Sequence, residues 1–148
     1  NLLELADSAV SALRERAEER HIGLSVSGEN LMVDGVRNFL YEMFYNLIDN
    51  AIKYNIDGGK VEVTVLTGDT AATVSVKDTG IGIPPEYQAR VFERFFRVDK
   101  SRSKASGGTG LGLSIVKHIA QYHHAEIKLH SGNGRGTIIE ILFAIGEM

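Results

Sequence analysis

Two asparagines and a lysine are spaced so that they could share one face of a helix. Asn46, Asn50 and Lys53 are separated by four and three residues, within a segment of helical periodicity. Amide oxygens are hard ligands that suit Mg²⁺ when a phosphate supplies the negative charge, and an ammonium can contact that phosphate. Taken alone, the three residues are more typical of a solvated helix face, so other motifs must decide between the two interpretations.

A second motif, DTGIG at 78–82, directly follows a predicted strand. The carboxylate of Asp78 could accept a hydrogen bond from a donor such as the amino group of adenine. Gly80 and Gly82 would let a flat ring approach the backbone closely. The same pattern is as often a simple tight turn, so alone it leaves both interpretations open.

The third motif is the glycine-rich stretch GGTGLGLSIVKH at 107–118. It lacks the spacing of a Walker loop and of a dinucleotide-binding fingerprint. Gly108, Gly110 and Gly112 stand at a predicted helix entrance, where free backbone N–H groups and the helix dipole favour an anion such as phosphate. A flexible hinge in front of a helix would have the same composition.

The segment between these motifs, 97–108, contains Arg97, Lys100, Arg102 and Lys104 against a single acidic residue, Asp99. Cations on a loop beside a phosphate site suggest a lid, although a solvated charged loop is the better interpretation for the two lysines and Arg102. Arg97 follows the aromatic run FERFF and can therefore be positioned as a phosphate clamp. None of the five histidines has ligand spacing, and none is assigned a catalytic role.

Hydrophobic periodicity predicts the elements that must position these residues. Some segments space their apolar residues as a helix does, and the first of them contains Leu2, Leu5, Ala9, Ala12 and Leu13. Other segments place an apolar residue at every second position, which is typical of strands. Mixed helices and antiparallel strands favour an α+β two-layer sandwich. The predicted helices cover 2–20, 35–55, 86–96 and 111–123, and the predicted strands cover 23–27, 31–33, 60–66, 71–77, 125–131 and 136–143.

Composition excludes several classes of protein. The chain has 148 residues, 43% of them hydrophobic, which suffices for one core. A formal net charge of −3 argues against nucleic acid as a partner, and the absence of cysteine excludes disulfides and thiolate-bound metals. No apolar run approaches the roughly 20 residues of a membrane span, so this chain taken alone is expected to be soluble, without direct membrane contact.

Four segments in this order closely resemble the N, G1, F and G2 boxes of the ATP-binding domain of bacterial sensor histidine kinases: NLIDNAIKY (46–54), DTGIGIP (78–84), FERFFRVD (92–99) and GGTGLGLSIVK (107–117). The resemblance covers residues 22–143. It implies the Bergerat fold, with a mixed, mostly antiparallel sheet on about three helices. It also implies two regions: a helix at 1–21 that follows a dimerisation and acceptor region, and an ATP-binding domain at 22–148 with its lid near 97–108.

The resemblance assigns roles to individual residues. It implies Mg²⁺ ligation by Asn50 and Asn46, phosphate contacts by Lys53 and Arg97, and an adenine pocket built on Asp78. The other residues implied to contact or support ATP are Tyr54, Gly80, Gly82, Ile83, Gly108, Thr109, Gly110, Leu111, Gly112 and Thr137.

The implied reaction transfers the γ-phosphoryl group of ATP to a histidine nitrogen, mostly by positioning and charge neutralisation. No histidine here has the context of an acceptor box, so the acceptor is expected on a dimerisation domain of the same, homodimeric kinase. A response regulator would be the next partner, and the domain would lie in the cytoplasm beneath an inner or plasma membrane.

Rival functions on the same fold stay open. ATP-hydrolysing relatives use a Glu at the position of Asn46 as the base that activates water. The amide of Asn46 cannot act as a base, but Glu42, one turn earlier, could polarise a nucleophile. The same fold could also serve as a serine kinase of the anti-sigma type, or as an ATP-binding module without transfer activity.

Overall fold

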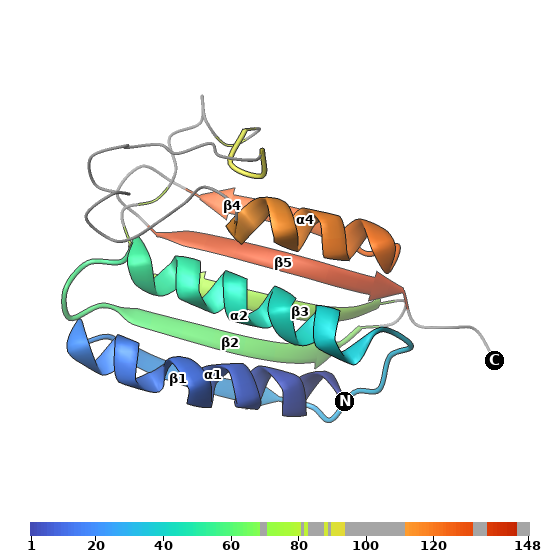
Figure 1. Ribbon diagram of the computed structural model, residues 1–148, viewed down its shortest axis with the longest axis horizontal. Helices are drawn as coiled ribbons and strands as arrows, with labels where there is room; N and C mark the ends of the chain where they lie inside the picture. Colours follow the sequence, from blue (N-terminus) through green and yellow to red (C-terminus); the bar gives the residue numbers. More distant parts are fainter. Residues whose placement is uncertain are drawn as a thin grey trace.

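Among the described residues, three helices cover one face of a five-stranded sheet (Figure 1). The computed structural model describes residues 1–68, 71–80, 82, 88, 90–93, 112–131 and 136–144. This architecture confirms the predicted α+β sandwich. The elements are α1 (Leu2–Glu19), β1 (Gly23–Gly28), α2 (Arg37–Lys53), β2 (Lys60–Thr67), β3 (Ala71–Asp78), α4 (Gly112–Tyr122), β4 (Glu126–Ser131) and β5 (Thr137–Ala144).

The strand order in the sheet is β1-β2-β3-β5-β4, with β1 parallel to β2 and every other pair antiparallel. The strands predicted at 60–66, 71–77, 125–131 and 136–143 are confirmed, and they form two antiparallel pairs, β2 with β3 and β4 with β5. Their strict alternation places Val61, Val63 and Val65 on the buried face of β2, with Val74 and Ile141 on the same face of the neighbouring strands. The register sets Asp78 opposite Thr137 at one end of the sheet.

The helix α2 lies between α1 and α4 and supplies the largest fully buried side chain among the described residues, that of Phe44. Leu40, Leu47, Ile48 and Ala51 are also buried and form the core face of this helix. In α1, however, Ala12 is exposed. Rotation of the helix directs Ala6, Val10 and Ala17 inwards alongside Leu2, Leu5, Ala9 and Leu13.

One predicted strand is wrong. Residues 31–33 form no strand, although their composition is apolar. The backbone N–H of Leu2 donates to the carbonyl of Leu31 at 2.8 Å, and Leu31 and Val33 pack against the core as a connection between β1 and α2. Three residues are too few to show whether apolar side chains belong to a sheet or to a covering loop.

Three further predicted features fall largely outside the described residues. Of the helix at 86–96, the described part includes a turn in which the N–H of Glu93 donates to the carbonyl of Arg90 at 2.9 Å. The loop at 97–108 and residues 132–135, which connect the strands predicted at 125–131 and 136–143, lie outside the described residues entirely.

Candidate functional site

Asp78 ends β3 with its carboxylate held by backbone donors. The N–H of Gly80 donates to Oδ1 at 2.8 Å, and the backbone N–H of Thr137 on β5 is a second donor. Burial raises the pKa of Asp78 to about 6, although the two backbone hydrogen bonds act in the opposite direction. A carboxylate that is half-buried and has lost part of its hydration is typical of a group that binds a ligand.

Thr137 supports this aspartate through its backbone rather than through its hydroxyl. Its side chain is buried, and its Oγ1 lies 2.9 Å from Oγ of Ser131 on β4. The resemblance implied a supporting threonine at this position without saying how it would act. The pairing of β3 with β5 answers that, because it sets the amide of Thr137 beside Asp78.

Gly80 allows the turn after β3 to press against the end of α2. A Cβ placed on Gly80 would lie 2.5 Å from the backbone oxygen of Tyr54 and 2.9 Å from Oδ1 of Asp78. Neither group can move away without disturbing the helix end or the carboxylate. Gly82 is buried with φ of 76°. The structure therefore joins the DTGIG motif to the carboxyl end of the asparagine-bearing helix.

The polar stripe of α2 faces the start of α4. Nδ2 of Asn46 donates to the carbonyl of Glu42 at 2.8 Å. A Cβ on Gly112, the first residue of α4, would lie 3.4 Å from Oδ1 of Asn46. The helix entrance of the glycine-rich stretch and the asparagine stripe are therefore neighbours in space, although they lie far apart in the sequence.

Asn50 and Lys53 continue the stripe towards the end of α2. Asn50 is half-buried. Nζ of Lys53 lies 3.1 Å from Oδ2 of Asp49, one turn earlier on the same helix. Tyr54 is the C-cap residue of α2 and is partly exposed.

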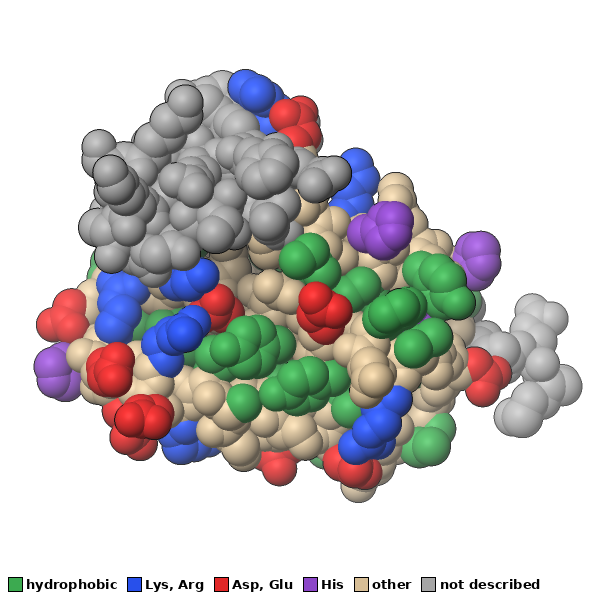
Figure 2. Space-filling view, in the orientation of Figure 1, with side chains coloured by type: hydrophobic (Ala, Val, Ile, Leu, Met, Phe, Trp, Pro, Cys, Tyr) green, Lys and Arg blue, Asp and Glu red, His purple; other side chains and the backbone are tan. Residues whose placement is uncertain are grey.

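The sequence did not identify Asp49 as a residue of the site. In the sequence it is only a charged residue next to the asparagine stripe, and nothing there indicates that it is buried. Its side chain is only 11% exposed. It accepts from Lys53 through Oδ2 and from Nη1 of Arg16 on α1 through Oδ1, a contact that raises the pKa of Arg16. Figure 2 shows Lys and Arg side chains gathered with acidic ones where α1 and α2 end.

Arg20 caps the carboxyl end of α2. Its guanidinium donates to the backbone oxygens of Ile52 and Lys53, each at 2.6 Å, and of Asn55 at 2.8 Å. A cation at this end of a helix is attracted to the negative end of the helix dipole. It also donates hydrogen bonds to carbonyls that have no partner within the helix. No pattern in the sequence indicates that the end of α1 reaches the end of α2.

Asn55 and Thr79 connect this helix end to the sheet. Asn55 is fully buried, and its Nδ2 donates to the carbonyl of Lys60 at 3.0 Å. The hydroxyl of Thr79 donates to Oδ1 of Asn55 at 3.2 Å and accepts from the N–H of Lys60 at 2.9 Å. Because Thr79 follows Asp78 directly, this network fixes the backbone that carries the buried carboxylate.

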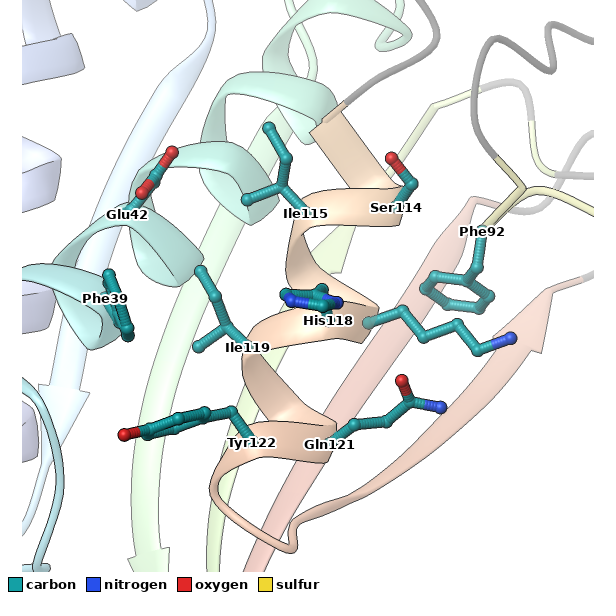
Figure 3. Close-up of a pocket in the computed structure, with 10 residues that line it drawn as sticks. Phe39, Glu42, Phe92, Ser114, Ile115, His118, Ile119, Gln121 and Tyr122 are labelled. Carbon is teal, nitrogen blue, oxygen red and sulfur yellow. The ribbon is translucent and has the colours of Figure 1, made fainter.

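Glu42 lines a different hollow of the surface, an open groove of about 910 Å³ between α2 and α4. Figure 3 shows Glu42 and Phe39 on α2 facing a row of α4 side chains that includes His118 and Tyr122. The rings of Phe39 and Tyr122 meet edge to face with centroids 5.7 Å apart.

Six of the predicted site residues lie outside the described part of the chain: Ile83, Arg97, Gly108, Thr109, Gly110 and Leu111.

Amide oxygens are the available ligands for a cation at this site. Among the described residues, no three His, Cys, Asp or Glu side chains are grouped closely enough to hold a metal ion. The oxygens of Asn46 and Asn50 suit Mg²⁺, which accepts few protein ligands when phosphate oxygens complete its shell. In the described ranges, no helix is both long and apolar enough to cross a membrane.

Comparison with known proteins gives one consistent result. The family model described as "Histidine kinase-, DNA gyrase B-, and HSP90-like ATPase" matches residues 35–146. The sensor histidine kinase RppB of Synechocystis is 38% identical over 146 residues, which cover 97% of this chain and 32% of RppB. The chain spans about a third of the length of the curated relatives it matches.

Solved structures agree with this family in fold. The mycobacterial sensor histidine kinase MprB superposes with a TM-score of 0.83 at 32% identity, covering 95% of this chain and 92% of the MprB chain. Full-length ShkA, solved in complex with AMPPNP, superposes with a TM-score of 0.82 at 25% identity over 100% of this chain and 31% of ShkA.

Proposed function

The chain belongs to the family of histidine kinase-, DNA gyrase B- and HSP90-like ATPases, and we propose that it is the catalytic domain of a sensor histidine kinase. It binds Mg·ATP along the polar face of α2 and transfers the γ-phosphoryl group to a histidine on a separate domain. The observation that carries this proposal is the meeting of α2 with both glycine motifs, through Tyr54 with Gly80 and through Asn46 with Gly112.

The base of the nucleotide binds at the end of β3. Asp78 accepts a hydrogen bond from the exocyclic amino group of adenine, and the amides of Gly80 and Thr137 orient the carboxylate for it. Tyr54 packs beside the ring, and Gly80, Gly82 and Ile83 form the wall that the flat ring approaches. AMPPNP in the related ShkA supports an adenine nucleotide as the ligand of this fold.

The phosphates lie towards the start of α4. Asn46 and Asn50 would hold Mg²⁺ through their amide oxygens, and Lys53 would contribute its ammonium to the phosphates. The phosphates bind to backbone N–H groups of residues 108–112, at the entrance of α4. These residues are Gly108, Thr109, Gly110, Leu111 and Gly112. Arg97 contacts the terminal phosphate. Bound Mg²⁺ neutralises charge on the phosphates, and the residues of the chain hold them in line for transfer.

In the reaction, a nitrogen of the acceptor histidine attacks the γ-phosphorus, the bond from phosphorus to the β,γ-bridging oxygen breaks, and ADP leaves. The product is a phosphoramidate. The dimerisation and acceptor domain of the same kinase, which acts as a homodimer, supplies the histidine, and a response regulator then receives the phosphoryl group. We place the domain in the cytoplasm, as part of a sensor anchored in the inner or plasma membrane.

The test is phosphoryl transfer in trans. Radiolabelled Mg·ATP is incubated with this chain and with a separately supplied dimerisation and acceptor domain of the same kinase, followed by acid and alkali treatment of the labelled protein. Label on the acceptor that acid removes and alkali preserves is the expected result. Steady ATP hydrolysis without acceptor, lost in Glu42→Gln, would instead identify an ATPase.

A further inference from the structure

The carboxylate of Asp49 is shared between two helices. One oxygen binds Lys53 of its own helix at 3.1 Å, and the other binds Arg16 of α1. The three side chains differ in exposure: that of Asp49 is 11% exposed, that of Lys53 23% and that of Arg16 48%. Arg16 therefore reaches a buried acid from the rim of the site, whereas Lys53 and Asp49 lie within it.

The balance of charge in this group determines what Lys53 offers to an anion. A pair of Lys53 and Asp49 alone is neutral, so a phosphate would meet the ammonium and the carboxylate together. With Arg16 the group has a net positive charge, because one carboxylate faces two cations. Coulomb interactions at this degree of burial are strong enough to alter ligand affinity.

Stability alone does not account for the second cation. An acid buried to the extent of Asp49 needs a partner, and Lys53, one turn along α2, already provides one. Arg16 is supplied by another helix, and it engages the oxygen that Lys53 leaves unused. The arrangement connects the position of α1 to the charge of the proposed phosphate site.

We propose that Arg16 is a positioning residue for the nucleotide phosphates, which acts by neutralising Asp49 and so leaves a net positive charge beside Lys53 for ATP. This inference rests on the proposed function, since it requires that Lys53 contacts phosphate. In this proposal Arg16 acts through Asp49 and not by contacting the nucleotide. Loss of its charge should weaken binding of the triphosphate while leaving recognition of the base unchanged.

The experiment compares Mg·ATP with adenosine by isothermal titration in wild type, Arg16→Gln, Arg16→Lys and Arg37→Gln. Arg37 is the matched control because it is also an arginine ion-paired to an acid, Glu4, but at the opposite end of α2. In Arg16→Gln the Kd for ATP should rise about 3- to 10-fold, with that for adenosine unchanged. Arg16→Lys should stay near wild type, and so should Arg37→Gln.

Two results would overturn the inference: an unchanged Kd for ATP in Arg16→Gln, or an equal rise for ATP and adenosine, which is the mark of a general loss of structure. A double-mutant cycle adds a third check. In an Asp49→Asn background, Arg16→Gln should have little effect, and an effect as large as in wild type would show that Arg16 does not act through Asp49. The variant Lys53→Gln distinguishes failure of the proposed function from failure of the inference about Arg16. Unchanged ATP binding in Lys53→Gln would contradict the phosphate contact of Lys53, whatever Arg16 does.

Discussion

Replacing Asp78 by asparagine is expected to stabilise the nucleotide-free domain while abolishing ATP binding. The side chain keeps its shape, and the Oδ1 of asparagine can still accept from the N–H of Gly80. What changes is the charge, which burial disfavours. A carboxylate that stabilised the fold would give the opposite result, so this substitution separates a residue kept for a ligand from one kept for structure.

The magnitude follows from the pKa. Burial raises the pKa of Asp78 from 3.8 to about 6. At 1.36 kcal/mol per pH unit, the charged carboxylate costs the folded state up to about 3 kcal/mol at neutral pH. The sign is set by protons: between these two pKa values the folded protein holds a proton that the unfolded chain has released. Stability of the wild type therefore falls as the pH rises from about 4 to about 6, and this contribution is absent in Asp78→Asn.

The assay is urea unfolding followed by circular dichroism at several pH values, together with titration of Mg·ATP at pH 7.5. The variant should be more stable than wild type at pH 7.5, by up to about 3 kcal/mol, and the difference should shrink towards zero near pH 4. A variant less stable than wild type at pH 7.5 would refute the reasoning about burial. Unchanged ATP titrations would refute the assignment of the adenine pocket.

Further expectations concern the same end of the sheet. The affinity of the wild type for ATP should fall as the pH is lowered through about 6, because the protonated carboxyl of Asp78 accepts less well; titrations at pH 7.5 and 5.5 test this, and equal affinities would contradict it. Gly80→Ala should lower the free energy of unfolding by about 1–3 kcal/mol, since its Cβ would meet the backbone oxygen of Tyr54. Arg20→Gln should cost about 2 kcal/mol in urea unfolding, because three carbonyls at the end of α2 lose a cationic donor; wild-type stability would contradict the capping role.

The elements with strict periodicity were predictable from the sequence. Alternation in residues 60–66 and 71–77 identified two strands, because β2 and β3 each bury every second side chain. Residues 31–33 were mistaken for a strand, since a short apolar segment packs equally well as a covering loop. The parallel pairing of β1 with β2 depends on the crossover through α2, which no local pattern reveals.

The segments that carry the candidate site were recognisable from the sequence, because their chemistry resides in short motifs. Asp78 and the stripe from Asn46 to Lys53 were found by residue type and spacing, and the structure brings their segments together at Gly80 and Gly112. The contacts of Arg16 and Arg20 could not be predicted, because each joins positions more than 30 residues apart through the packing of α1 on α2. Sequence spacing within one helix gives no information about its neighbour.

Binding of ATP compared with ITP tests the assignment of Asp78 most directly. The two nucleotides differ at the position of the exocyclic amino group, where ITP has a carbonyl oxygen that would face the carboxylate. We expect ITP to bind at least about tenfold more weakly than ATP at pH 7.5, because a buried acceptor would lose its donor. Equal affinity for the two nucleotides would contradict recognition of adenine by Asp78.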